Sequence, residues 1–410
     1  MRKIAVIGGG ISGLSIAQCL KEQNEVTVFE GDSKPGGLIK CDRIDGTLYH
    51  MVGGHVFNSR RQDVLDWFWG FFNREEEFTK ATRNAIVYMG RPIGYPIENH
   101  IYQFDAEVQK QIIIDLLQIA ENKNREPNNF EEFLRFRFGE TLYNVYFKPY
   151  NEKVWKRDLS QVPLTWLAGK LPMPSVEEII FDNFNKANET TMVHSTFYYA
   201  KYNGSQFLVD RLAEGLHIKF NAKIEKLEKK EGKWIVNGEV FDKIIFCGNV
   251  KDLPSMVEGE IDILTHKKTI EELEFHGTTS VLCEVERNPF SWIYMPDETH
   301  HSHRIICTGN FSETNNGHDA LTATIEFTDE VDEKSIRENL KKIPYSPKYL
   351  AHRYTKYTYP IQNGSTRAVI DSIKEVMKPE GLFLLGRFAE WEYYNMDAAI
   401  GAAIDLSKTI

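Results

Sequence analysis

The chain has 410 residues, 42% of them hydrophobic and 26% charged, which is ordinary for a globular protein. One hydrophobic core does not suffice at this length, so two or three folding units are expected. The formal net charge of −10 argues against a nucleic-acid-binding protein, whose footprint is basic. An anionic ligand would therefore need a local cluster of arginines.

No apolar run in the sequence reaches the roughly 20 residues of a membrane-spanning helix. The start, MRKIAVIGGG, breaks into glycines before the apolar core of a signal peptide forms, so we expect a cytoplasmic protein that makes no membrane contact. The cysteines form no C-x-x-C pair, which predicts reduced thiols, no disulfide framework and no metal site. They are Cys19, Cys41, Cys247, Cys283 and Cys307.

The opening segment, KIAVIGGGISGLSIAQCLKEQNEVTVFEGD, predicts a buried strand, a glycine turn, a helix that begins near Ser12, and a second strand. Gly8, Gly10 and Gly13 form G-x-G-x-x-G, and Glu30 follows Gly8 by 22 positions. In this pattern the glycines allow a tight turn, a close approach to a pyrophosphate and close packing of helix on strand. The acid is placed to bind a ribose 2′-OH, so the pattern predicts a dinucleotide site.

A helical unit is predicted next, because apolar residues recur at helical spacing over 106–155. We expect this helical pattern to be interrupted at Pro127 and closed near Pro149. Segments rich in β-branched and aromatic residues follow, and they predict antiparallel strands within 277–296, 303–311 and 319–330.

Two further segments predict a return to the first unit. Residues 217–249 indicate hairpin-like strands that lead back to a buried strand before Gly248. The last segment, 381–410, predicts a buried strand that ends at Gly386 and runs into a helix. The segment from Asn395 to Ala398 is the candidate helix start, where free N–H groups and the helix dipole favour negative charge.

The glycine pair Gly36 and Gly37, a few residues after Glu30, is similar to that of glutathione-reductase-like flavoproteins and favours FAD over NAD. The arginine that often follows this pair is absent, because Leu38, Ile39 and Lys40 stand there.

Five blocks together resemble the UDP-galactopyranose mutase family, within the superfamily of FAD-dependent amine oxidases and protoporphyrinogen oxidases. One of them, SWIYMPDETHHSHRIICTGNFSETN, is similar to the eukaryotic branch, in which a substrate tyrosine precedes a substrate arginine by ten positions. Tyr294 and Arg304 keep that spacing. The other blocks are MVGGHVFNSRR, RNAIVYMGRPIGYPIENH, YNEKVWKRDLSQVPLTWLAGKLP and GRFAEWEYYNMD.

The resemblance implies an α/β fold: a Rossmann-like FAD-binding domain of the glutathione reductase type, an inserted helical module and an antiparallel β-sheet domain. The FAD-binding domain is expected to comprise residues 1–80, 203–255 and 372–410. The helical module is expected over 101–190. The substrate domain is expected to comprise 81–100, 191–202 and 256–371.

The resemblance also implies a chemistry: a reduced-FAD-dependent mutase that interconverts UDP-galactopyranose and UDP-galactofuranose, or a close UDP-hexose analogue. In this family flavin N5 is the nucleophile at C1, and the reaction is redox-neutral overall. NADH or NADPH is then the expected external reductant. The expected partner is a small nucleotide-sugar, with no nucleic acid and no membrane, and the chain is expected to form a homo-oligomer.

The resemblance assigns candidate site residues. Catalytic candidates are His55, in a loop beside the flavin, Arg304 and Arg387. Substrate-binding candidates are Tyr95, Trp155, Tyr294, Arg304, Tyr359 and Tyr393, with Trp166 as a further pocket tryptophan. Cofactor-binding candidates are Gly8, Gly10, Ser12, Gly13, Glu30, Gly36, Gly37, Gly53, His55, Gly386, Arg387, Asn395, Met396 and Asp397.

The family supplies two arginines to the diphosphate, and Tyr198 stands here at the place of the first. Lys201, or an arginine from another loop such as Arg91, is the expected substitute. Two other interpretations stay open. One is an FAD-dependent oxidase or dehydrogenase of the amine oxidase or protoporphyrinogen oxidase type, and the other is a non-catalytic flavoprotein.

Overall fold

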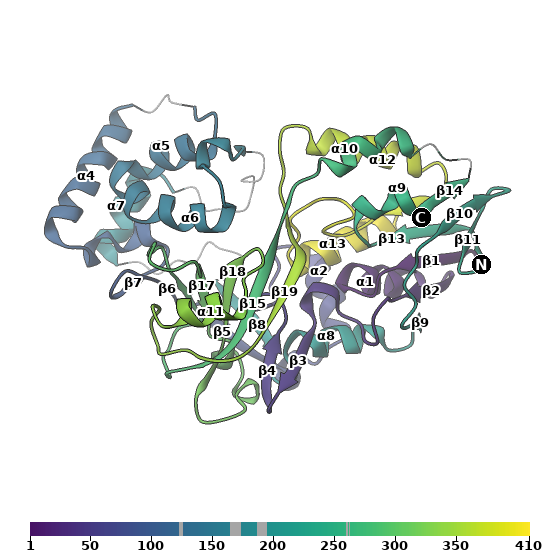
Figure 1. Cartoon of the computed structure of the whole chain (residues 1–410), viewed down its shortest axis with the longest axis horizontal. Coiled ribbons are helices and arrows are strands. Elements are labelled where there is room, and N and C mark those ends of the chain that lie inside the picture. Colours follow the sequence, from purple (N-terminus) through teal and green to yellow (C-terminus); the bar gives the residue numbers. More distant parts are fainter. Residues whose placement is uncertain (123–125, 165–173, 187–194, 260, 262) are drawn as a thin grey trace.

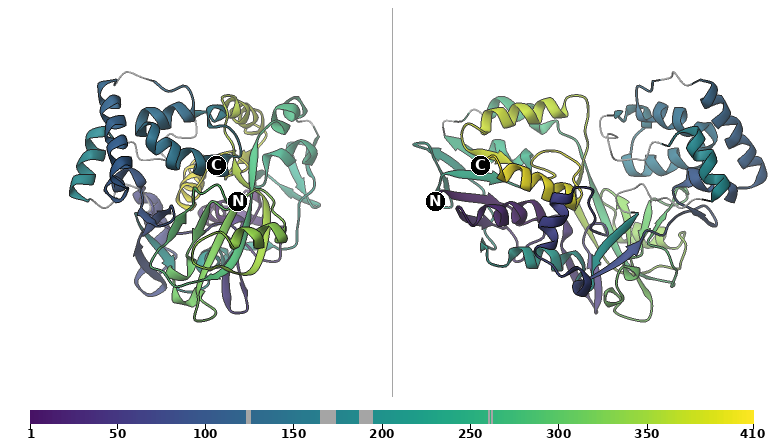
Figure 2. Two further views of the ribbon diagram at one scale, coloured as in Figure 1. Left: turned by 60° about the vertical axis from the view of Figure 1, so that its left-hand side comes forward. Right: turned by 180° about the vertical axis from the view of Figure 1, so that it is seen from behind.

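The computed structural model describes residues 1–410 except 123–125, 165–173, 187–194, 260 and 262. Within the described part, a parallel sheet, an antiparallel sheet and a group of helices form three packed bodies, which confirms the expected mixed α/β class (Figure 1). The helical group and the parallel-sheet body both stand on the antiparallel sheet, as the views from other sides also show (Figure 2). No described helix is both long and apolar enough to cross a membrane.

The first sheet has five parallel strands in the order β20-β13-β1-β2-β9. The two N-terminal strands pair in register along their whole length, and the glycine turn leads from β1 directly into helix α1, Ile11–Leu20. The strands are β1 Lys3–Ile7, β2 Glu25–Phe29, β9 His217–Lys219, β13 Lys243–Phe246 and β20 Leu382–Leu384.

Alternate side chains of this sheet enter two different cores, as the two-residue period of a strand requires. Ile4 and Val6 of β1 pack with α1 and the C-terminal helix α13, Met396–Ser407. Ala5 and Ile7 pack on the opposite face with a small four-stranded sheet and α12, Thr366–Met377. The small sheet consists of β10 Leu227–Lys230, β11 Lys233–Val236, β12 Glu239–Phe241 and β14 Val257–Gly259.

The second sheet has seven strands in the order β19-β15-β18-β17-β16-β6-β7, antiparallel except between β16 and β6. The expected antiparallel strands are therefore confirmed. Helix α11, Glu333–Leu340, packs on this sheet through Ile336 and Leu340. The strands are β6 Ala85–Tyr88, β7 Pro92–Gly94, β15 Phe275–Val285, β16 Trp292–Tyr294, β17 Arg304–Ile306, β18 Leu321–Thr328 and β19 Lys348–Pro360.

The helical group contains α4 Ala106–Glu121, α5 Phe130–Leu142, α6 Lys148–Trp155 and α7 Val176–Asn185. The expected end near Pro149 is wrong, because this proline lies in the first turn of α6. The residues before it, Phe147 and Lys148, already have helical backbone angles, so the proline lies within a continuing helical path. One π-helical turn, Tyr143–Phe147, joins α5 to α6.

The remaining short elements connect the three bodies. Two of them, β5 and β8, form an antiparallel pair between the parallel-sheet body and the seven-stranded sheet. Their bounds are α2 Gln62–Trp69, α3 Arg74–Glu77, α8 Gly204–Ala213, α9 Leu253–Met256, α10 Lys267–Glu271, β3 Cys41–Ile44, β4 Thr47–His50, β5 Phe78–Thr82 and β8 Thr196–Ala200.

The expected domain boundaries stay a prediction. The packing adds one detail, because Met256, Ile270 and Leu273 belong to the core of the parallel-sheet body, although the expected boundary lies at residue 255. Ile370 of α12 also belongs to that core, close to the expected boundary at 372.

The glycine turn gives the first testable prediction. A Cβ at Gly13 would lie 1.9 Å from the carbonyl oxygen of Gly8, so Gly13→Ala must displace backbone. We expect the free energy of unfolding to fall by roughly 1–3 kcal/mol, despite the better helix propensity of alanine. Urea denaturation checks this. Gly364→Ala is the control, because its added Cβ meets no atom within 4 Å, and an equal loss in both variants would contradict the prediction.

Candidate functional site

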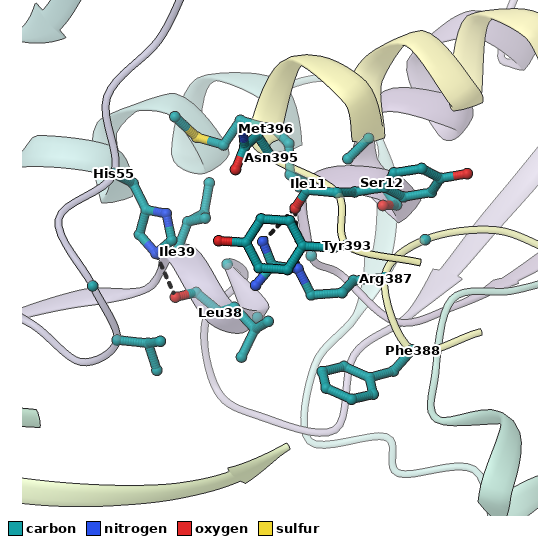
Figure 3. A pocket seen from close by; sticks show the side chains of 18 of the residues that line it. Ile11, Ser12, Leu38, Ile39, His55, Arg387, Phe388, Tyr393, Asn395 and Met396 are labelled. Atoms are coloured by element: carbon teal, nitrogen blue, oxygen red, sulfur yellow. Dashed lines mark hydrogen bonds between the residues drawn. The ribbon is translucent and has the colours of Figure 1, made fainter. Parts of the chain in front are cut away.

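A cavity of about 430 Å³ lies where the glycine turn, the start of α13 and the seven-stranded sheet meet. Its wall unites segments that are far apart in the sequence, from Gly8 to Ala399. Figure 3 shows part of its wall, to which Ile11, Ser12, Leu38, Met396 and Tyr393 contribute.

Glycines line the end of the cavity nearest the parallel sheet. Gly8 and Gly36 have φ values of +112° and +138°, which side chains rarely allow. Gly36 N donates to Gly9 O at 2.9 Å, so the two glycine segments lie against each other, and a Cβ at Gly10 would lie 3.7 Å from Gly37 Cα. We call the two glycine segments, residues 8–10 and 36–37, the glycine cradle. Because glycines have no side chains, a ligand can approach the backbone of this cradle closely.

Glu30 lies at the same end, as the sequence predicts. Its carboxylate accepts hydrogen bonds from the backbone N–H groups of Gly9, at 2.8 Å, and Asp32, at 2.9 Å. These bonds hold the acid against the glycine turn. Lys40, near the place of the missing arginine, instead pairs with Asp32 at 2.6 Å.

Two helices begin at the cavity wall, α1 after Gly10 and α13 after Asn395. Neither N-terminus has a side-chain cap among the described residues. The first N–H groups of a helix have no partner within it, so both helix ends suit an anionic or hydrogen-bond-accepting ligand, with the N–H of Ala398 already bonded to the Asp397 carboxylate. The glycine cradle and the two helix ends fit a dinucleotide whose phosphates and ring system occupy one continuous space.

His55 is half-buried in the wall, and its Nε2 donates to Leu38 O at 3.1 Å (Figure 3). Burial, assisted by the nearby positive charge of Arg387, lowers the pKa of His55 to about 4. The imidazole is therefore neutral at pH 7, and Gly53 lies directly beside its ring.

Arg387 lies against the ring of Tyr393, with the guanidinium carbon 4.8 Å from the ring centroid (Figure 3). Its nitrogens donate to the carbonyl oxygens of Tyr394 and Thr358, so its orientation is set by backbone. The ring of Tyr393 in turn stacks on that of Tyr359, with centroids 5.6 Å apart and an interplanar angle of 13°. Gly386, with φ +104°, forms the turn that directly precedes Arg387.

Arg304 faces the cavity from β17 and is directly opposite Tyr294 of β16 in the sheet register. Its Nε donates to Glu326, a fully buried residue of β18, and its second terminal nitrogen donates to the hydroxyl of Tyr359 at 2.8 Å. Burial opposes the charge on Arg304, but the Glu326 carboxylate raises its pKa well above the ordinary range. The guanidinium is permanently charged and held in one orientation.

Arg83 is a cavity residue that the sequence analysis did not single out. It follows β5 and donates to the hydroxyl of Tyr294. Its guanidinium carbon lies 5.1 Å from the ring centroid of Trp292 and 5.2 Å from that of Tyr95. The signal that would have revealed it is its place at the start of the block RNAIVYMGRPIGYPIENH, whose Tyr95 was already a candidate.

Three candidates do not line this cavity. Tyr95 lies one layer behind it, with its ring 4.7 Å from that of Tyr294. Trp155, at the end of α6, packs against Phe130 within the helical group. Asp397 follows the first residue of α13, and burial raises its pKa. Trp166 lies outside the described residues.

The expected substitutes for the missing arginine do not reach the cavity either. Lys201 donates to Glu75 O at 2.9 Å, and Arg91 is exposed and donates to Gln103 O. Tyr198 packs against Trp69, with centroids 5.0 Å apart, and does not line the cavity. The other candidates from the sequence do line it, and they are Gly8, Gly10, Ser12, Gly13, Glu30, Gly36, Gly37, Gly53, His55, Tyr294, Arg304, Tyr359, Gly386, Arg387, Tyr393, Asn395 and Met396.

Comparison with known proteins agrees with this geometry. Residues 6–74 match the family of NAD(P)-binding Rossmann-like domains. The sequence is 23% identical to dTDP-fucopyranose mutase of Escherichia coli, covering 100% of this chain and 98% of that protein. It is 20% identical to UDP-galactopyranose mutase of Mycoplasma genitalium, covering 99% of this chain and 94% of that protein. The fold is similar to a crystal structure of reduced UDP-galactopyranose mutase, with a TM-score of 0.88, 21% identity, and coverage of 100% of this chain and 93% of that chain.

Over its whole length this chain is similar to pyranose mutases of sugar nucleotides, and its fold is similar to that of reduced UDP-galactopyranose mutase. The resemblance of the sequence blocks is thereby confirmed, and so is the fold class. The narrower expectation, that the eukaryotic branch is nearer, stays a prediction.

A buried group of polar side chains near the cavity predicts how stability depends on pH. His50 is fully buried between Cys41 Sγ, at 3.4 Å, and the hydroxyl of Tyr199, at 2.7 Å. Burial, with a smaller contribution from His55, lowers the pKa of His50 to about 3. An unfolded histidine has a pKa of about 6.5, so below that pH the unfolded chain binds the additional proton.

We therefore expect the contribution of His50 to the free energy of unfolding to be complete above about pH 6.5. This contribution should fall by about 1.4 kcal/mol per pH unit as the pH falls toward 3. Urea denaturation at pH 7 and pH 5, at a fixed FAD concentration, measures this slope. His50→Gln should reduce the difference between the two pH values, whatever its effect at pH 7. An unchanged difference would contradict the prediction.

Proposed function

We propose that this protein is a reduced-FAD-dependent nucleotide-sugar mutase that interconverts the pyranose and furanose forms of a nucleoside diphosphate hexose. The observation that supports it most is the gathering of three guanidinium groups, with three of the four lining tyrosines beside them, in the wall of the same cavity as the glycine cradle. The guanidinium groups belong to Arg83, Arg304 and Arg387, and the phenols to Tyr294, Tyr359 and Tyr393.

This wall suits a departing diphosphate. Interconversion of ring forms requires the anomeric C1–O bond to the nucleotide to break, which leaves negative charge on the phosphate oxygens. Planar guanidinium groups bind such oxygens by charge-assisted hydrogen bonds, and phenol hydroxyls add neutral donors. Arg304 and Arg83 already donate to the hydroxyls of Tyr359 and Tyr294, so each cation is paired with a phenol that points toward the same space.

The cofactor site is assigned to the glycine cradle and the two helix N-termini. Gly8, Gly10 and the first turn of α1 would hold the pyrophosphate, and Glu30 the ribose. The start of α13 and His55 would flank the ring system, where neutral His55 adds no charge. In its reduced form the bound flavin supplies the nucleophile for the anomeric carbon. An external nicotinamide nucleotide as the source of electrons belongs to the same proposal.

The sugar nucleotide is a UDP-hexose in this proposal, with UDP-galactopyranose as the first candidate. The full-length relatives are named for two nucleotides and two sugars, UDP-galactopyranose and dTDP-fucopyranose. Both substrates share the diphosphate that the arginines would bind, so both belong in the test.

The oxidase alternative receives no support from Tyr198, because that side chain packs on Trp69 and not in the cavity. Porphyrinogens carry propionate carboxylates, which guanidinium groups also bind, so the support for the mutase comes from the full-length similarity to two pyranose mutases together with the phenols that accompany the arginines. We therefore propose the mutase and not the oxidase.

The central prediction concerns turnover. The FAD-loaded protein, reduced with dithionite, should interconvert UDP-galactopyranose and UDP-galactofuranose, or the corresponding dTDP-fucose pair, whereas the oxidised protein should not. Chromatographic separation of the two ring forms measures the reaction. Production of hydrogen peroxide from an amine or a porphyrinogen, without ring interconversion, would contradict it.

A second prediction tests the proposed phosphate ligands. Arg304→Ala and Arg83→Ala should each raise the dissociation constant of UDP from the reduced protein roughly ten- to hundredfold, because each removes a charge-assisted hydrogen bond. The flavin spectrum should persist in both variants. Arg91→Ala is the matched control, since that arginine is exposed and outside the cavity wall, and it should leave UDP binding unchanged. Loss of FAD in Arg304→Ala would contradict the assignment.

A further inference from the structure

Helix α6 contacts the seven-stranded sheet through Lys153, whose side chain is 9% exposed. The helix belongs to the helical group and lies above β17 and β18 in Figure 1. A buried lysine is rare unless it is paired, so its hydrogen-bond partners need an account.

All three partners of Lys153 are backbone carbonyls of one loop. Its Nζ donates to Met295 O at 3.0 Å, to Ser302 O at 3.2 Å, and to Asp297 O. An ammonium group has three N–H donors, so these bonds use its full capacity. Burial lowers the pKa of Lys153 to about 8, and the ammonium is still charged at pH 7.

The loop joins the two strands that face the cavity. Met295 directly follows Tyr294, the last residue of β16, and Ser302 precedes Arg304, the first residue of β17, by two positions. Tyr294 and Arg304 are paired across the ladder, which Met295 N extends by donating to His303 O at 2.9 Å. Lys153 therefore contacts the loop near both strand ends, one residue after Tyr294 and two residues before Arg304.

We propose that Lys153 is a positioning residue for substrate binding: by bridging both ends of the β16–β17 loop, its ammonium holds the phenol of Tyr294 and the guanidinium of Arg304 in place. It touches neither substrate nor cofactor. The inference rests on the proposed function of this cavity, because it assumes that Tyr294 and Arg304 bind the nucleotide.

A second contact between α6 and the seven-stranded sheet also supports Tyr294. The ring of Tyr150, one turn before Lys153, packs edge-on against Tyr294 with centroids 5.5 Å apart. The helix thus supports Tyr294 from behind through one residue and the loop through another. Replacing Lys153 alone leaves the aromatic contact intact, so the two contributions are separable.

The test is UDP binding to the reduced, FAD-loaded protein. Lys153→Met keeps the length and apolar body of the side chain but leaves three carbonyls without their donor. The dissociation constant of UDP should rise at least about tenfold, and KM should rise by more than kcat falls. Thr328→Val is the matched control. It removes a different bond between α6 and the sheet, from Thr328 Oγ1 to Val154 O at 3.3 Å, and should leave UDP binding within about twofold.

A double-mutant cycle separates positioning from general destabilisation. If Lys153 acts through Arg304, Lys153→Met should weaken UDP binding much less in the Arg304→Ala background than in the wild type. Equal losses in both backgrounds would overturn the inference. UDP affinity and KM of Lys153→Met within twofold of the wild type, with the flavin retained, would also overturn it.

Two further outcomes are decisive. If Lys153→Met does not fold, Lys153→Gln carries the same test, because its amide retains two donors and should give an intermediate dissociation constant. If the wild-type protein binds neither UDP nor dTDP, the proposed function fails and the inference fails with it. If the wild type binds UDP and the Lys153 variants bind it equally well, the inference about Lys153 is overturned while the proposed function stands.

Discussion

The buried ion pair between Glu326 and Arg304 is the interaction on which the rest of the cavity depends. Glu326 is fully buried, so removal of its partner would leave an uncompensated charge, at a cost of about 3–5 kcal/mol. That cost holds Arg304 at the cavity wall. Arg304 then donates to Tyr359, whose ring stacks on Tyr393, and Tyr393 lies against Arg387. One carboxylate on β18 thereby orients a series of side chains that ends beside the first turn of α13.

The arginines of the cavity wall explain how a chain with a negative net charge can bind an anion. The net charge of −10 demands that any phosphate site be a local concentration of cations, and the structure collects three arginines from three separate segments. Glu326 compensates one of them, while Arg387 is bound by carbonyl oxygens, which carry no net charge. With Glu30 as the carboxylate among the cavity-lining residues and Glu326 behind Arg304, the three arginines still leave the wall with a net positive charge.

Local patterns in the sequence predicted the features that local geometry determines. The glycine turn, Glu30 and the two helix starts follow from short-range rules, and all of them lie in the cavity wall. The ten-residue spacing of Tyr294 and Arg304 has an equally direct cause, because the two residues are paired neighbours in an antiparallel hairpin. A spacing of this kind survives only if the loop between the strands keeps its length.

Residues that act through long-range contacts could not be predicted in this way. Glu326 lies in none of the blocks and Lys153 was not singled out within its block, because each gains its role from partners on another strand or in another folding unit. Trp155 illustrates the converse limit. A tryptophan within a recognisable block suggests a binding pocket, and its ring here packs against the helical core, where a large aromatic side chain is equally at home.

Arg83 and Tyr198, the position where the resemblance leads us to expect an arginine, both lie along the ladder between β5 and β8. Tyr198 pairs with Lys80, whereas Arg83 N donates to Ser195 O at 2.8 Å, one step beyond the last pair of the ladder. The two positions thus lie on neighbouring strands, about three residues or roughly 10 Å apart along them. A long guanidinium side chain can serve one binding site from either strand, provided that it starts at the end of the ladder nearer the cavity. Arg83 starts there and lies over the ring of Trp292. The cavity therefore has a cation beside Arg304 although residue 198 is a tyrosine.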